Sequence, residues 1–279
     1  MMLRLTAFFF SFLFAPLVYA QGIDHSDFDA YLKQVITPEG QVNYRLALEK
    51  RPALDAYIKR LQAINFKALD QNPQPELLAF WLNIYHAALL SLVLDHYPLD
   101  STQTIPSFWE RQFLGLGGKK TGENEDPNEP VKRLSLSQIR VDELMSRFND
   151  VKVHLSLPVA AKDGPLFPRD AYTGPRALGQ LYKKTRLEVN RPEMVQIDIA
   201  AKTVKLSRLF EWYAADFIEK YNRPERRAKL RRSDTAVVNF LIRYIKDAEK
   251  IKFLKTGQFK IEYAPFDWRL NDTSSAPAE

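Results

Sequence analysis

The residues best suited to chemistry lie on one short segment near the middle of the chain. Residues 151–158 alternate apolar and polar side chains, which predicts a β-strand. His154 and Ser156 would then share the polar face of that strand. A histidine can accept a proton near pH 7, and an activated serine hydroxyl can act as a nucleophile. With Asp267 as the orienting carboxylate, these three residues are the candidate catalytic residues of a hydrolase-like enzyme.

Two arguments weigh against this chemistry. Neighbouring side chains on one strand face point in parallel, which is poor geometry for Ser156 to donate a hydrogen bond to the ring of His154. A histidine on a strand is also commonly a structural residue with both nitrogens bonded. A metal held by His86, His154 and a carboxylate is the other catalytic alternative, but the chain has no HExxH-like spacing. We therefore predict no metal site and no cofactor.

A second set of polar residues lies inside the longest apolar stretch after the N-terminal one. Residues 76–96 have apolar side chains on both sides of a helical projection, which predicts a buried central helix. Asn83 and His86 are three residues apart and so are neighbours on one side of that helix. Burial would oblige each to find a hydrogen-bond partner. Candidate pocket or binding residues are Trp81, Asn83, Tyr85, His86 and Trp268.

The N-terminus predicts export. Residues 1–20 combine one arginine, an apolar run and a small-residue end at Ala20, which is typical of a signal peptide cleaved after that residue. We expect a periplasmic or secreted protein with no transmembrane segment after cleavage. The chain has no cysteine, so thiol catalysis and cysteine metal sites are excluded, and stability must come from a hydrophobic core.

The elements that must position these residues are mostly helices. Helical spacing is predicted over residues 28–35, 46–68, 76–96, 134–148, 175–185, 207–217 and 237–251, and strands over 151–158, 195–199, 203–206 and 259–263. The fold class predicted is α+β, a predominantly helical single domain with a small sheet around a buried central helix. We expect one globular domain over residues 21–271, with a core at about 70–185, a C-terminal part at 186–271 and a disordered tail at 272–279.

Several local patterns occur together in one order. They are residues 80–87 (FWLNIYHA), 117–119 (GGK), 134–136 (LSL), 153–157 (VHLSL), 206–213 (LSRLFEWY) and 266–271 (FDWRLN). Together they resemble the domain of unknown function number 547 family, over about residues 42–271. Members of that family typically have Asn at the position of His86, and an Asn-Cys segment followed by a second Cys after the histidine strand. Here Pro158, Val159 and the turn at residues 163–165 fill those positions, so the resemblance implies a member without a thiol.

Two function classes follow. The favoured one is a non-catalytic binding protein, in which a cleft without its thiol keeps recognition of a ligand or partner. The alternative is the hydrolase-like enzyme that uses His154 with a hydroxyl nucleophile or a bound metal. The whole chain carries a formal charge of +6, and the basic run between Lys220 and Arg232 is the candidate contact for an anionic envelope component. Nucleic acid is not an expected partner, because that run lacks interleaved aromatic residues.

Overall fold

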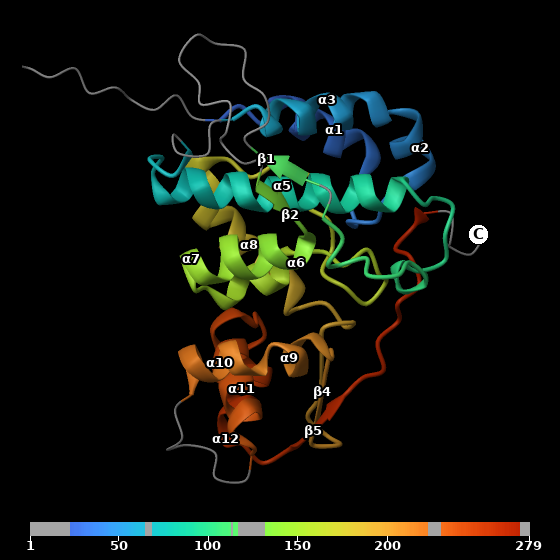
Figure 1. The fold of residues 1–279 in the computed structure, drawn as a ribbon. Helices are drawn as coiled ribbons and strands as arrows, with labels where there is room; N and C mark the ends of the chain where they lie inside the picture. The colour runs from blue at the N-terminus through green and yellow to red at the C-terminus, as the bar shows by residue number, and fades with distance from the viewer. Residues whose placement is uncertain (1–22, 65–68, 113, 117–131, 223–229, 274–279) are drawn as a thin grey trace, which may run out of the picture.

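One long apolar helix forms the centre of the structure. The computed structural model describes residues 23–64, 69–112, 114–116, 132–222 and 230–273 (Figure 1). Helix α5 (Gln74–Leu94) runs across the whole upper half of the molecule, and nearly all of its residues from Leu77 on are buried. A helix that is apolar all round needs cover on every side. The predicted central helix is therefore confirmed.

The length and hydropathy of α5 would also allow it to cross a membrane. Of its most apolar 18-residue window, however, 94% is buried inside the protein. We interpret α5 as the core helix of this fold.

The upper core forms around α5. It contains α1 (Ser26–Val35), α2 (Tyr44–Glu49), α3 (Arg51–Gln62), η1 (Thr102–Thr104), β1 (Leu114–Leu116), β2 (Lys132–Leu134), α6 (Leu136–Gln138), the π-helix η2 (Ile139–Met145), α7 (Ser146–Phe148), η4 (Gly174–Arg176) and α8 (Ala177–Glu188). Strands β1 and β2 form an antiparallel pair. The helix predicted over residues 46–68 is in fact two, because Pro52 in the first turn of α3 cannot donate the backbone hydrogen bond that a continuous helix requires. Residues 65–68 lie outside the described part.

The lower core contains the small sheet and the remaining helices. Strands β3 (Val195–Asp198) and β4 (Thr203–Leu206) are antiparallel, and β5 (Lys260–Tyr263) lies parallel to β4. The helices are α9 (Leu209–Trp212), α10 (Ala214–Tyr221), α11 (Arg232–Tyr244) and α12 (Ala248–Thr256). The expected last helix over 237–251 is wrong in its extent, because Asp247 caps a new helix by accepting from the backbone N–H groups of Glu249 and Lys250. The predominantly helical α+β fold is confirmed.

The predicted strand over residues 151–158 is wrong. Residues Val151–Ser156 form a 3₁₀-helix, η3, which is buried between the two cores. Val151 and Leu155 pack in the lower core, whereas Val153 and Leu157 pack in the upper core. The alternation of apolar residues thus serves two cores on opposite sides, and not one face of a strand.

The C-terminal segment joins the two cores. After β5 the chain returns to the upper half, where the C-terminal end of the described part lies near α2 and the end of α5 (Figure 1). The Leu270 backbone N–H donates to the Asp100 carbonyl oxygen (2.7 Å), and Asp272 forms a parallel bridge with Val42. The Tyr44 hydroxyl donates to Asn271 Oδ1 at 2.8 Å in the interior. Ordered pairing therefore continues two residues past the expected boundary at 271, while residues 274–279 lie outside the described part.

Candidate functional site

A cleft of about 340 Å³ opens between the two cores, beside η3. Its upper wall comes from α5, α6, η2 and the segment after η1, and its lower wall from α9 and the C-terminal segment. The lining residues are Tyr85, Trp109, Glu110, Leu136, Ser137, Arg140, His154, Leu157, Val159, Trp212, Tyr213 and Trp268. The cleft is thus mainly aromatic, with few charged side chains.

Aromatic rings form the lower wall of this cleft. Trp212 is 43% exposed, and its ring stacks on Trp268 with a centroid distance of 5.5 Å and an interplanar angle of 24°. Phe266 packs against both rings, at 4.9 Å from Trp212 and 4.6 Å from Trp268. Large, partly exposed rings offer a flat apolar surface to a ligand at a low cost in side-chain entropy.

His154 lies in the cleft wall with a carboxylate partner. Its Nε2 is 2.7 Å from Asp216 Oδ2, on α10. The ring stacks face to face on Tyr213, which sits between α9 and α10, at a centroid distance of 3.8 Å and an angle of 6°. The imidazole is 3% exposed. One edge and one face of His154 are therefore already engaged by the protein.

The electrostatics favour a neutral His154 beside an ionised Asp216. Burial lowers the pKa of His154 below 6.5, although the hydrogen bond to Asp216 acts in the opposite direction. The hydrogen bond from His154 lowers the pKa of Asp216. We therefore assign the tautomer in which Nε2 carries the proton and donates to the carboxylate. Nδ1 is then a lone-pair acceptor, and it is buried without a hydrogen bond to any described residue.

Arg140 is the cation of the cleft. It belongs to the π-helix η2, and its guanidinium lies over the Tyr213 ring, 5.1 Å from the centroid, while Nη1 donates to the Tyr213 hydroxyl. No ion pair joins Arg140 to an acidic residue in the described part of the chain. Its charge helps to lower the pKa of Asp216 without forming an ion pair, and its guanidinium can still meet a negatively charged group in the cleft.

The structure brings together three of the eight residues expected from the sequence. His154, Tyr85 and Trp268 all line the cleft, and the Tyr85 hydroxyl donates to the Pro158 carbonyl oxygen at 3.0 Å. Ser156 is fully buried and is not part of the cleft wall. A hydroxyl in this position cannot meet a substrate that enters the cleft.

Asp267 is not the carboxylate bonded to His154. It forms an ion pair with Arg269, which lowers the pKa of Asp267. Its backbone N–H donates to Asp163 Oδ2 at 2.8 Å. The backbone of the same segment also accepts from Lys162, since Lys162 N–H donates to the Arg269 carbonyl oxygen (2.9 Å). Asp267 thus fastens the C-terminal segment to the turn after η3.

Trp81, Asn83 and His86 are internal residues of α5. Asn83 makes two hydrogen bonds of 2.8 Å with the backbone N–H and carbonyl of Tyr172, and so holds the segment before η4. His86 Nε2 donates to the Ser156 carbonyl oxygen at 2.8 Å, and burial lowers its pKa to about 3. Trp81 is fully buried. None of the three lines the cleft, and the polar groups of Asn83 and His86 instead position backbone segments around it.

The metal site considered above, with His86, His154 and a carboxylate as ligands, has no counterpart among the described residues. No group of three or more histidine, aspartate or glutamate side chains there could hold a metal ion. His86 binds a backbone carbonyl and His154 binds Asp216, so the two imidazoles are used separately.

Sequence reasoning missed Asp216, Arg140 and Tyr213. Asp216 lies 62 residues after its histidine, at the start of a helix where an acidic residue is ordinary. Tyr213 was within one of the segments that carry the family resemblance, residues 206–213, and that was the available signal. Arg140 had none, because an arginine on an amphipathic helix is usually solvated.

Comparison with known proteins adds no relative. The chain matches no family model, no curated protein and no solved structure at a significant level.

Proposed function

We propose that this is an exported binding protein whose cleft holds a small organic ligand with a flat face and an acidic group. The observation that carries the proposal is the cleft of about 340 Å³, in which aromatic rings surround Arg140. Such pockets bind by apolar contact, with a few polar groups that fix the orientation of the ligand. The stacked rings of Trp212 and Trp268 would contact the flat face, and Arg140 would bind the acidic group.

The state of the candidate catalytic groups supports binding over catalysis. His154 Nε2 is already bonded to Asp216, and the Ser156 hydroxyl is buried outside the cleft. The family resemblance points the same way. Val159, in the segment where members carry Asn-Cys, lines the cleft, so an apolar side chain stands where a thiol is expected.

Intrinsic fluorescence can test the binding directly. The chain has four tryptophans, of which Trp109, Trp212 and Trp268 line the cleft, while Trp81 is fully buried. Titration with aromatic carboxylates and with uronic acids should quench this fluorescence saturably. The substitutions Trp212→Ala and Arg140→Met should each weaken the binding by about tenfold, the effect of losing roughly 1.4 kcal/mol.

Arg243 provides the matched control for Arg140. Its guanidinium lies over the Tyr221 ring at 5.3 Å, a similar cation–π pair outside the cleft. Arg243→Met should leave the titrations unchanged. Saturable quenching that survives both cleft substitutions, or no quenching by any member of either ligand class, would refute the proposed function.

The export part of the proposal has its own test. It is supported by the signal-like pattern of residues 1–20, which lie outside the described part. Expressed in a Gram-negative host, the protein should be released by osmotic shock and should begin at Gln21 on N-terminal sequencing. Protein that stays in the cytosolic fraction with residues 1–20 attached would contradict export but leave the binding proposal standing.

A hydrolase-like enzyme is the second candidate function. The observation that favours it is the His154–Asp216 pair at the edge of the cleft, because a base with an orienting carboxylate is half of a catalytic constellation. Turnover of nitrophenyl esters that is lost in His154→Gln and Asp216→Asn would support it. Equal background hydrolysis by these variants and the original protein would exclude ester hydrolysis at this site.

A further inference from the structure

A second concave surface lies on the other side of the upper core. It is a groove of about 770 Å³ between α8 and two loops, residues 37–40 and 166–170. It shares no lining residue with the aromatic cleft. We call it the α8 groove.

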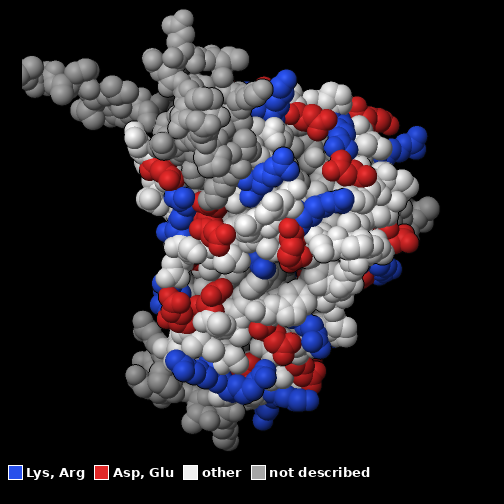
Figure 2. All heavy atoms as spheres, in the orientation of Figure 1, with Lys and Arg blue, Asp and Glu red and all other residues white. Residues whose placement is uncertain are grey.

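The α8 groove is strongly basic. Its lining includes six basic residues against Glu39 and Asp170, a local charge of +4, compared with +6 for the whole chain. By contrast, acidic and basic residues are interspersed over most of the face shown in Figure 2. Five of the cations form no ion pair with a described residue: Arg169, Arg176, Lys183, Arg186 and Lys246. These charges are therefore free to meet a negatively charged partner.

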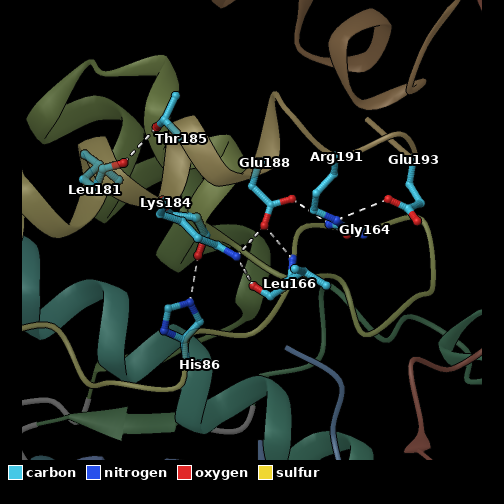
Figure 3. Close-up of polar contacts among 10 residues, drawn as sticks. His86, Gly164, Leu166, Leu181, Lys184, Thr185, Glu188, Arg191 and Glu193 are labelled. Atoms are coloured by element: carbon cyan, nitrogen blue, oxygen red, sulfur yellow. Dashed lines mark hydrogen bonds and ion pairs between the residues drawn. The ribbon is translucent and has the colours of Figure 1, made fainter. Parts of the chain in front are cut away.

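The sixth cation helps to build a rigid floor. Lys184 Nζ, 7% exposed at its side chain, donates to Glu188 Oε1 and to the Leu166 carbonyl oxygen, both at 2.5 Å (Figure 3). Glu188 Oε1 also accepts from the Leu166 backbone N–H at 3.0 Å, and Oε2 accepts from Arg191 at 2.7 Å. The fully buried Glu188 carboxylate thus joins helix α8 to the loop that forms the opposite wall. A groove whose walls are tied together needs little ordering when it binds.

The shape and lining favour one class of occupant. A concave groove cannot lie flat on a membrane surface. The lining residues come from helices and loops and none belongs to a described strand, so there is no strand edge to which a peptide could add. Tyr182 stands among the cations with 46% of its surface exposed. A half-exposed ring between positive charges suits a sugar that carries acidic groups.

We propose that the α8 groove binds an acidic oligosaccharide, with the five cations on its carboxylate groups and Tyr182 against the face of one sugar ring. This inference does not depend on the function proposed for the aromatic cleft. The substitution Trp212→Ala should therefore leave it unchanged.

The probe is a fluorescently labelled galacturonate oligomer, titrated by fluorescence polarisation. We expect saturable binding that weakens as salt is added, because exposed charges are screened. The triple variant Lys183→Ser/Arg186→Ser/Lys246→Ser should lose about tenfold in affinity, since three solvent-accessible charge contacts together contribute on the order of 1.4 kcal/mol. Tyr182→Ala should lose about fivefold, and Tyr182→Phe should keep the original affinity.

The matched control removes three exposed lysines elsewhere, in Lys59→Ser/Lys252→Ser/Lys255→Ser. It has the same change in net charge and should bind the oligomer as the original protein does. A neutral galactose oligomer of equal length should not bind. The proposal is overturned if the galacturonate oligomer does not bind, or if both triple variants lose affinity equally. It is also overturned if a glutamate peptide or anionic phospholipid vesicles bind better than the oligomer at this groove.

Discussion

Acidification from pH 7 to pH 5 should destabilise this protein strongly. His25, His86 and His154 are all buried, and two of them have pKa values far below 6.5. Burial lowers the pKa of His25 to about 4 and that of His86 to about 3. In the unfolded chain both residues regain ordinary values near 6.5. Below pH 6.5 the unfolded state therefore binds protons that the folded state does not bind.

The size of the effect follows from proton linkage. For a group whose folded pKa is lowered, stability falls as the pH decreases from the unfolded value towards the folded one. Between pH 7 and pH 5, His25 and His86 should each remove about 2 kcal/mol from the free energy of unfolding. His154 acts in the same direction, because its pKa is also lowered. The total loss is then about 4 kcal/mol or more, a large part of the stability of an ordinary domain.

The assay is urea unfolding at pH 7 and pH 5, followed by circular dichroism, with His86→Asn as the test variant. Asparagine can still donate to the Ser156 carbonyl oxygen but cannot take up a proton. The variant should lose about 2 kcal/mol less than the original protein on acidification, whatever its stability at pH 7. Equal pH dependence in the two proteins would refute the assignment of His86 as a buried neutral residue. His96→Asn serves as the control, since His96 is only partly buried.

Three further predictions concern other parts of the fold. Glu188→Gln should lower the free energy of unfolding, measured with urea, by about 3–5 kcal/mol, because it leaves Lys184 and Arg191 without their shared carboxylate. Glu193→Gln, at a side chain with 43% exposure, should lower it by under about 1 kcal/mol. A loss below about 1 kcal/mol at Glu188 would contradict the role given to this network. Because the chain has no cysteine, a single introduced thiol can be followed by its reaction with iodoacetamide. Val159→Cys should react in the folded protein, whereas Ala161→Cys, at a residue with 2% exposure, should react only after unfolding. Similar rates of reaction for the two folded variants would show that Val159 does not face the cleft. A chain that ends at Leu270 should be less stable by about 2 kcal/mol or more, since it lacks the partner of the Tyr44 hydroxyl. A chain that ends at Thr273 should unfold at the same urea concentration as the original protein. Equal unfolding midpoints for the two shortened chains would show that residues 271–273 do not stabilise the fold.

The central helix was predictable because its signal is local. A mainly apolar run from Leu77 to Leu94, with Pro75 in the first turn of the helix and Asp95 at its end, specifies a buried helix almost without context. The pairing of β3 with β4 was predictable for the same reason, since two alternating runs are separated by a short turn. Even the burial of Asn83 and His86 could be expected once this helix was recognised as apolar on all sides.

The cleft was not predictable, because it depends on contacts between distant residues. Periodicity alone could not distinguish η3 from a strand, since its alternating apolar residues face two different cores. Once η3 is a 3₁₀-helix, His154 and Ser156 no longer share a face, and the supposed nucleophile is separated from the supposed base. The partner of His154 is then set by how α10 packs against η3, which a single sequence does not reveal.

The C-terminal segment has a consequence for the order of synthesis. Val42 and Tyr44 leave the ribosome early, yet their partners Asn271 and Asp272 are among the last described residues of the chain. A nascent chain therefore cannot complete the upper core during translation, and the missing pairs are those between its most distant segments.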